Sequence, residues 1–294
     1  MKIAIYGQYY LNSTEPIIKD IFVFFKKNNV ELIIESAFLE MLYEKNLIHE
    51  TYQTFSSHTE LDSSFDMLIS IGGDGTILRA ATLVRNSSVP ILGINAGRLG
   101  FLATIKKDNI DSFLQFVIDK KYSISKRTLL SLDCSPENEA IKEINFAMNE
   151  ITVSRKDTTS MITIETYLND EFLNSYWADG LIISTPTGST GYSMSCGGPI
   201  LTPDVKSLVI TPIAPHNLNA RPLVIPDNTE IKLRVTGRED QYLVSLDSRV
   251  TTVKNESILI IKRNPFEINM VEIQQETFLK TLRNKLLWGE DKRN

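Results

Sequence analysis

The chain has 294 residues, of which 42% are hydrophobic and 23% charged. This composition is ordinary for a globular protein and excludes disordered and fibrous classes. The length exceeds what one hydrophobic core usually supports, so we expect two domains. The net charge of −5 gives no overall field that attracts nucleic acid or an anionic membrane, and we expect neither as a partner.

The cysteine pattern and the hydropathy of the chain bear on the cellular compartment in which we expect the protein. Cys134 and Cys196 show neither metal-ligand spacing nor a disulfide framework. The apolar run before Gly7 is too short for the core of a signal peptide, and no stretch of about 18 apolar residues could span a bilayer. We therefore predict a cytoplasmic protein with reduced thiols.

Residues 1–121 alternate between strand and helix patterns. Residues 2–6 have the alternation of a strand, and residues 16–28 have helical spacing behind Pro16, a favourable first-turn residue. Further strands are predicted at 31–36, 65–71 and 89–95, and further helices at 37–47 and 76–86. This order predicts an α/β domain with a parallel sheet.

From residue 122 the period changes to two, which predicts an antiparallel β domain over residues 122–273. The runs lie at 122–134, 146–155, 160–170, 171–185, 207–215, 230–237, 241–247 and 257–263. Residues 276–289 return to helical spacing, with basic residues toward the C-terminal end. We expect the segment 274–294 to pack back on the first domain.

The sharpest motif is GGDGT at residues 72–76, between a predicted strand and a helix expected to begin near Ile77. Glycines let the backbone approach phosphate oxygens, and a helix N-terminus attracts anions. Asp74 would repel a phosphate unless it held Mg²⁺ or accepted a proton from an attacking hydroxyl, two tasks of phosphoryl transfer. The alternative is that Asp74 only caps the helix, and the pattern leaves both open.

Two other segments attract attention. Residues 179–199 combine glycines and hydroxyl side chains after a β run, which suits recognition of sugar and amide groups, or else forms a long hydrophilic loop. Asn149 and Glu150 interrupt a strand pattern, and both can face one ligand only where the strand bends or ends; otherwise they are surface residues. Walker A, GxGxxG and GxSxG patterns are absent from the sequence.

Taken together, the motifs resemble the NAD kinase family. They are the GGDGT motif, GINAGRLGFL at 93–102, the Asn149-Glu150 pair, the block at 179–199, PHNLNARPLVIP at 215–226 and Leu246-Asp247-Ser248. The resemblance implies a Rossmann-like, phosphofructokinase-like parallel sheet, an antiparallel β-sandwich that binds NAD, and a C-terminal helix returning to the first domain. It also implies phosphorylation of the 2′-hydroxyl of the adenosine ribose of NAD, with ATP or another donor and a divalent metal, Mg²⁺ being expected. A homodimer or homotetramer is implied as well.

The resemblance also assigns roles to residues. Asp74 is the expected catalytic base, and Gly72, Gly73, Gly75 and Thr76 are expected to bind phosphate. The expected NAD-binding residues are Asp74, Gly75, Thr76, Arg79, Asn149, Glu150, Asp179, Thr190, Gly191, Tyr192, Ser193, Ser195, Asp247 and Arg249. Gly191 stands where the family usually has Ala.

Two other functions are compatible with part of the pattern. A diacylglycerol-type lipid kinase shares GGDGT and the two-domain plan, but the acidic charge and the polar block at 179–199 favour a dinucleotide over an acyl chain. A non-catalytic protein that senses NAD would account for a binding pocket, but it would give Asp74 no chemical role.

Overall fold

The computed structural model describes residues 1–8, 14–97, 100–103, 105, 110–157, 160–273 and 277–289. The chain divides into two compact units, Met1–Lys126 with Ile268–Asn294, and Arg127–Glu267. We call them the first and the second unit. Within the described residues, no helix combines the length and the apolar character needed to cross a membrane.

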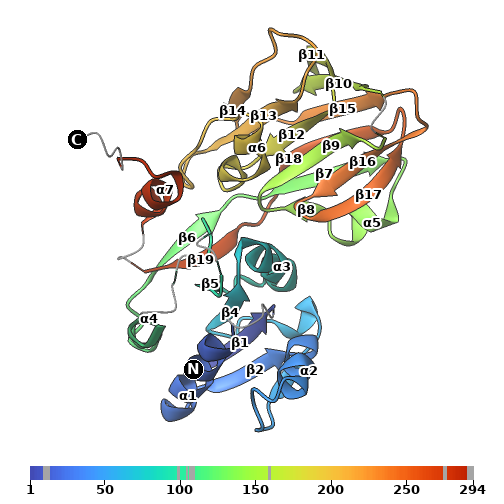
Figure 1. Ribbon diagram of the computed structural model, residues 1–294. Helices are drawn as coiled ribbons and strands as arrows, with labels where there is room; N and C mark the ends of the chain where they lie inside the picture. The colour runs from blue at the N-terminus through green and yellow to red at the C-terminus, as the bar shows by residue number, and fades with distance from the viewer. Residues whose placement is uncertain are drawn as a thin grey trace. The chain divides into compact units, whose positions relative to one another are not determined.

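The first unit is built on a seven-stranded sheet in the order β3-β2-β1-β4-β5-β19-β6 (Figure 1). Its strands are β1 Lys2–Gly7, β2 Glu31–Glu35, β3 Gln53–Phe55, β4 Met67–Gly72, β5 Ile91–Asn95, β6 Ser123–Arg127 and β19 Ile268–Glu272. The pairs β1 with β2, β1 with β4 and β4 with β5 are parallel, as the strand–helix alternation predicts.

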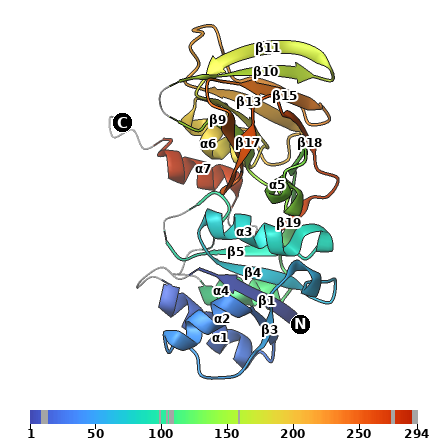
Figure 2. The same ribbon diagram turned by 90° about the vertical axis from the view of Figure 1, so that its right-hand side faces the viewer.

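Helices cover both faces of this sheet (Figure 2). The apolar sides of α1 Thr14–Lys27 and α4 Ile110–Ile118 share one core with Ile3, Ile69 and Ile71 of the strands. On the opposite face lies α3 Asp74–Val84, where Ile77 is so close to Gly93 of β5 that a Cβ there would be 2.4 Å from Ile77 Cδ1. The helix α2 Ser36–Glu44 is capped by the Glu35 carboxylate, which accepts the N–H groups of Ala37 and Phe38.

The C-terminal helix α7, Phe278–Leu286, belongs to the first unit. The rings of Phe278 and Phe101 lie 6.5 Å apart, and Lys285 Nζ lies 5.5 Å from the Phe101 ring. The sequence placed the domain boundaries after residues 121 and 273, whereas the compact units divide after residues 126 and 267. The difference arises because both β6 and β19 are strands of the first sheet.

The second unit consists of two antiparallel six-stranded sheets, β11-β10-β15-β18-β7-β8 and β14-β13-β12-β9-β16-β17. The strands of the first of these sheets are β7 Leu130–Ser135, β8 Phe146–Ala147, β10 Ile162–Leu168, β11 Glu171–Ala178, β15 Ile231–Thr236 and β18 Ile258–Arg263. Those of the second are β9 Glu150–Arg155, β12 Gly180–Ser184, β13 Ser207–Ile213, β14 Leu223–Pro226, β16 Gln241–Leu246 and β17 Arg249–Lys254. Apolar residues of both sheets form one cluster, including Ile164 and Leu233 from one sheet and Ile183 and Val244 from the other. The unit is a β-sandwich, and the predicted fold class is confirmed.

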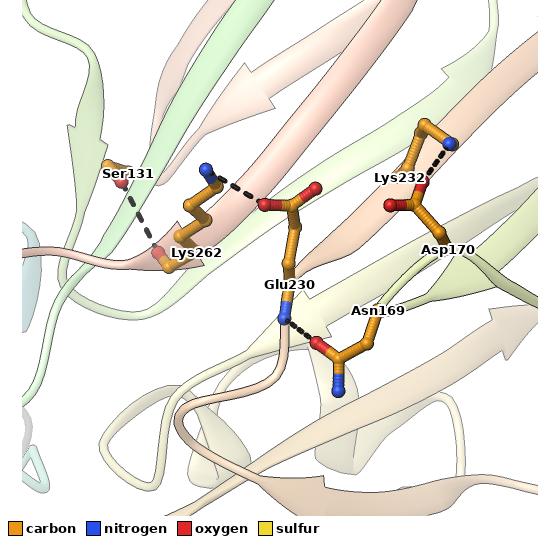
Figure 3. A network of polar contacts seen from close by, with 6 residues as sticks. All are labelled: Ser131, Asn169, Asp170, Glu230, Lys232 and Lys262. Atoms are coloured by element: carbon orange, nitrogen blue, oxygen red, sulfur yellow. Dashed lines mark hydrogen bonds and ion pairs between the residues drawn. The ribbon is translucent and has the colours of Figure 1, made fainter.

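The turn between β10 and β11 is tied to neighbouring strands by polar contacts (Figure 3). Asn169 and Asp170 both have positive φ, as a two-residue hairpin turn requires. The Asn169 side chain accepts the Glu230 N–H at 2.9 Å, and the Lys262 ammonium lies 2.8 Å from the Glu230 carboxylate. These contacts fix the position of the turn.

Candidate active site

The GGDGT motif forms a strand–turn–helix, in which β4 ends at Gly72 and α3 begins at Asp74. The helix therefore starts three residues before the expected Ile77, because Gly73 serves as its N-cap. The Thr76 hydroxyl is buried, accepts the Gly73 N–H at 3.3 Å and donates to Gln8 Oε1 at 3.2 Å. Gly72 is required beside it, since a Cβ on Gly72 would lie 2.2 Å from Thr76 Oγ1.

Asp74 does not cap the helix. Its carboxylate accepts three backbone N–H groups from another segment: Phe101 N at 2.8 Å, Leu102 N at 3.0 Å and Ala103 N at 3.0 Å. Oδ1 accepts two of these bonds and Oδ2 accepts one. An ionised carboxylate can accept about four, so the described residues leave one lone pair of Oδ2 available.

The first helical turn offers the groups that an anion needs. N–H groups at a helix start have no acceptor within the helix, and the helix dipole places positive charge there. Gly75 is exposed, and a Cβ at either Gly73 or Gly75 would meet nothing within 4 Å. Arg79 is also exposed and follows Gly75 by four residues, so it lies one turn further along the same side of the helix.

In the second unit, Asn149 and Glu150 lie where the chain changes from one sheet to the other. The strand β8 ends at Ala147 in one sheet and β9 begins at Glu150 in the other. Backbone contacts hold this crossover: Thr185 Oγ1 donates to the Met148 carbonyl at 2.6 Å, and Thr185 N donates to the Asn149 carbonyl at 2.9 Å. The pair is thus at a strand break, the one arrangement in which both side chains can face a ligand.

Asp247 and Arg249 secure the same crossover. The Asp247 carboxylate accepts the N–H groups of Met148 at 3.0 Å, Asn149 at 2.8 Å and Glu150 at 3.2 Å. The Arg249 guanidinium donates to the carbonyl of Ile144 at 2.6 Å and to that of Phe146. Both side chains, expected from the resemblance to bind NAD, are placed against the backbone that carries Asn149 and Glu150.

The side chains of Asn149 and Glu150 contain buried oxygens that lack a partner. Asn149 Oδ1 and Glu150 Oε2 accept no hydrogen bond from any described residue, and neither do the hydroxyls of Thr152 and Ser184. Ser184 is paired directly with Glu150 across β12 and β9. Buried polar atoms are nearly always satisfied, so this cluster has the character of a site for a polar ligand.

Burial raises the pKa of Glu150 to about 8, and the charge of Asp247 adds to the effect. A hydrogen bond from the Tyr192 N–H acts in the opposite direction. Burial likewise raises the pKa of Asp247, against the lowering effect of its three N–H bonds and of Arg249. Two carboxyl groups with raised pKa values, close to one another, are typical of functional sites.

The segment after β12 carries the remaining predicted residues, in η4 Gly188–Thr190 and α6 Tyr192–Ser195. A Cβ on Gly191 would lie 3.1 Å from Glu150 Oε2 and 3.6 Å from Asn149 Nδ2, so Gly191 directly adjoins the pair. Tyr192 and Ser195 are exposed. The hydroxyl of Thr190 donates to the Thr187 carbonyl, and that of Ser193 is buried against Thr211 Oγ1 at 2.8 Å.

Asp179 lies between β11 and β12, at a second point where the chain changes sheets. Its carboxylate is 3.1 Å from Arg155, and about a quarter of each side chain is exposed. Its charge contributes to a raised pKa of Tyr192, after the larger effects of burial and of Cys196.

The predicted residues thus form two groups, one in each unit. Gly72, Gly73, Asp74, Gly75 and Thr76 are contiguous at the start of α3. In the second unit, Gly191 adjoins the side chains of Asn149 and Glu150, Asp247 binds the backbone of both, and Tyr192 acts on the pKa of Glu150. Arg98 and Leu99 of the GINAGRLGFL motif lie outside the described residues.

Three residues that organise the site were not singled out from the sequence. They are Thr185, Gly188 and Gly100, which make their decisive contacts with Asn149 or Asp74 far away in the chain. Gly100 lies in the motif at 93–102, and Thr185 and Gly188 lie in the block at 179–199. Their position in these motifs is the signal by which the sequence could have indicated them. Among the described residues, no three His, Cys, Asp or Glu side chains are placed to hold a metal ion together.

Comparison with known proteins shows the family of the chain. Residues 12–122 match the model of the ATP-NAD kinase N-terminal domain, and residues 148–273 match that of the ATP-NAD kinase C-terminal domain. A curated NAD kinase of Flavobacterium johnsoniae is 78% identical over 294 residues and one of Bacteroides fragilis is 40% identical over 293, each over 100% of both chains.

Two solved structures share the fold. Yeast NADH kinase complexed with NADH has a TM-score of 0.88 at 22% identity, over 99% of this chain and 89% of that one. An NAD kinase from Archaeoglobus fulgidus in complex with ATP has a TM-score of 0.75 at 24% identity, over 98% and 99%. On the strength of the two family models and the curated relatives, this chain belongs to the NAD kinase family.

Proposed function

We propose that the chain transfers the terminal phosphoryl group of ATP to the 2′-hydroxyl of the adenosine ribose of NAD, giving NADP. The observation that carries this proposal is Asp74, a carboxylate at the start of a helix in a glycine-rich turn, with one lone pair of Oδ2 to which no described residue donates. The yeast relative with NADH and the archaeal relative with ATP support both classes of substrate for this fold.

Asp74 acts as the general base. The ribose 2′-hydroxyl gives its proton to Oδ2 while its oxygen attacks the phosphorus of the donor, and the bond from that phosphorus to the bridging oxygen breaks. The glycine backbone at 72, 73 and 75, the N–H groups of the first turn of α3 and the Arg79 guanidinium stabilise the phosphate charges. Thr76 shapes the turn through its contact with Gly73.

The second unit recognises the dinucleotide. Asn149 Oδ1 and Glu150 Oε2, both buried and unsatisfied, pair with polar groups of the adenosine. At neutral pH the Glu150 carboxyl retains its proton and donates a hydrogen bond. Asp247 contributes by fixing the backbone of these two residues, and Arg249 by binding the carbonyls of Ile144 and Phe146 just before them. Asp179, Thr190, Gly191, Tyr192 and Ser195 form the rest of the pocket, and Ser193 anchors their segment through its hydroxyl contact with Thr211.

A divalent metal ion, Mg²⁺ in our proposal, is part of the reaction. The described residues provide no cage of carboxylates, a donor set that fits a Mg²⁺ held mainly by the phosphates of the nucleotide and by water. When bound, the ion supplies charge neutralisation at the transferred phosphoryl group.

We further propose a cytoplasmic homo-oligomer, a dimer or tetramer. Cys134 and Cys196 are both free thiols, as a reducing compartment allows. The second unit exposes large apolar side chains on or near the edge strands β11 and β14, including Phe172, Trp177 and Val224, and a second copy would cover them.

The deciding experiment is an incubation of the purified chain with NAD, ATP and Mg²⁺, followed by detection of NADP with an NADP-specific dehydrogenase. NADP formation is the expected result. Binding of NAD without formation of NADP would instead indicate a non-catalytic sensor. The same assay with diacylglycerol in place of NAD tests the lipid kinase alternative, for which we expect no phosphorylated product.

A further inference from the structure

The segment 100–103 of the first unit makes direct contact with Asp74, the proposed base. Consecutive N–H groups at 101, 102 and 103 all converge on the Asp74 carboxylate, at 2.8, 3.0 and 3.0 Å. We infer that this segment is a positioning device for the reaction: it fixes the carboxylate of Asp74 so that only one lone pair of Oδ2 faces the substrate hydroxyl. The inference rests on the role of Asp74 in the proposed function.

Gly100 is what allows this contact. A Cβ on Gly100 would lie 1.8 Å from Asp74 Oδ1 and 2.4 Å from its Cγ, far inside van der Waals contact. Gly100 is also buried, so a side chain there could not turn away into solvent. A larger residue must therefore displace either the carboxylate or the three N–H groups that hold it.

A second side chain holds the segment in place from the sheet. Asn95 is buried at the end of β5; its Nδ2 donates to the Ala103 carbonyl at 3.0 Å and its Oδ1 accepts the Gly97 N–H at 2.7 Å. Asn95 N donates to the Ile105 carbonyl at 2.9 Å. The N–H groups that bind Asp74 are thus attached to the rigid carboxyl end of the parallel sheet.

The three backbone N–H groups restrict the rotation of the Asp74 carboxylate, which would otherwise turn about its own side-chain bonds. Two bonds to Oδ1 and one to Oδ2 define both the position and the rotation of the carboxylate plane. Misplacing a reacting group by about 1 Å can lower a rate by about 10²-fold, so a base on a freely rotating side chain would be inefficient. Gly100 and Asn95 are therefore positioning residues that act through Asp74.

The test compares Gly100→Ala with Gly97→Ala. A Cβ on Gly97 meets nothing within 4 Å, so it is a matched control from the same loop. We expect Gly100→Ala to lower kcat by about 10²-fold, with KM for NAD changed less than about threefold, and Gly97→Ala to alter neither by more than about twofold. Equal effects of the two substitutions on kcat would overturn the inference.

A double-mutant cycle shows whether Gly100 acts through Asp74. In an Asp74→Asn background the base is already lost, so adding Gly100→Ala should lower the residual kcat by less than about threefold. The same 10²-fold loss in both backgrounds would contradict the inference. If Asp74→Asn alone kept its kcat, the base assignment of the proposed function would fail instead.

Amide hydrogen exchange tests the contact itself without any activity measurement. Asp74→Ala removes the acceptor for the three N–H groups, so exchange at residues 101–103 should accelerate, while peptides of the second unit keep the exchange rates of the parent protein. Unchanged exchange at residues 101–103 would show that Asp74 does not hold the segment.

Discussion

The carbonyl oxygen of Asn149 lies so close to Gly188 that a Cβ on Gly188 would be 2.0 Å from it. Gly191, three residues later, is less restricted, since a Cβ there would be 3.1 Å from its nearest atom, Glu150 Oε2. The two glycines of one segment thus differ sharply in how closely they approach the pair that we propose to bind adenosine.

This difference gives the first prediction. Gly188→Ala must displace the Asn149 backbone and should weaken NAD binding by about tenfold or more, with a loss of about 1–3 kcal/mol of stability from overpacking. Gly191→Ala should change the Kd for NAD less than about threefold, because Glu150 needs to move by only a few tenths of an ångström. Calorimetric titration with NAD measures both, and equal Kd values for the two variants would refute the prediction.

The second prediction concerns Asp74→Asn. The amide oxygen still accepts N–H groups but cannot take the hydroxyl proton, so NAD binding should persist while kcat falls by about 10²- to 10⁴-fold. This corresponds to a barrier higher by roughly 3–5 kcal/mol. Steady-state kinetics and an NAD titration together check it. A variant with near-normal kcat would remove Asp74 from the role of base.

The third prediction is a pH dependence of stability caused by Glu150. Its pKa is about 8 in the folded chain against 4.5 as the ordinary value, so between these limits the folded state keeps a proton that the unfolded state has released. The free energy of unfolding of the ligand-free chain should therefore fall as the pH rises from about 5 to 8, by about 2–4 kcal/mol from this group.

Glu150→Gln removes that titration, so the free energy of unfolding of the variant should increase relative to that of the parent protein as the pH rises. Urea unfolding at pH 5, 7 and 9 compares the two. Glu143→Gln, at an exposed position on α5 Glu139–Glu143, is the control and should leave the pH profile of the parent unchanged. If the free energy of unfolding changed with pH equally in the parent and in Glu150→Gln, Glu150 would not be the source of the pH dependence.

The fourth prediction concerns Tyr192, whose side chain remains exposed by 46%. We expect its ring to complete the pocket of a neighbouring subunit. Asp74→Asn and Tyr192→Ala chains should each be weakly active, and a mixture after subunit exchange should regain part of the activity, because some sites then contain both intact residues. A monomeric elution at micromolar concentration, or no recovery after verified exchange, would exclude the shared site.

The sequence predicted the strand, the turn and the helix that carry the GGDGT motif. The apolar run 65–71, the glycine turn and the following helix were recognised because their signals lie within a few residues of one another. The start of α3 was misplaced, since Gly73 as N-cap has no side chain to indicate it. The helix α4, Ile110–Ile118, was missed, although its buried residues 110, 113, 114 and 117 have helical spacing.

The changes of sheet were harder to predict. The runs 122–134 and 171–185 each read as one continuous pattern of period two, and in 146–155 only the pair Asn149 and Glu150 interrupts it, yet each run contains the end of one strand and the start of another in a different sheet. Period two is the same in both sheets, so the pattern cannot show where the chain crosses. Likewise, the contacts of Asp74 with residues 101–103 and of Asp247 with residues 148–150 join segments distant in the chain, which local patterns do not record.

The backbone contacts of Asp247 and Thr185 bear on how the pocket can diversify. The Asp247 carboxylate accepts the N–H groups of residues 148–150, and the Thr185 hydroxyl donates to the Met148 carbonyl and accepts the Gly188 N–H, so all of these bonds are made to the main chain. Substitution at position 149 therefore changes the chemistry offered to a ligand while the main chain keeps its course. On the proposed role of Asn149 in binding adenosine, selection or design can retune base preference at this position in a single mutational step.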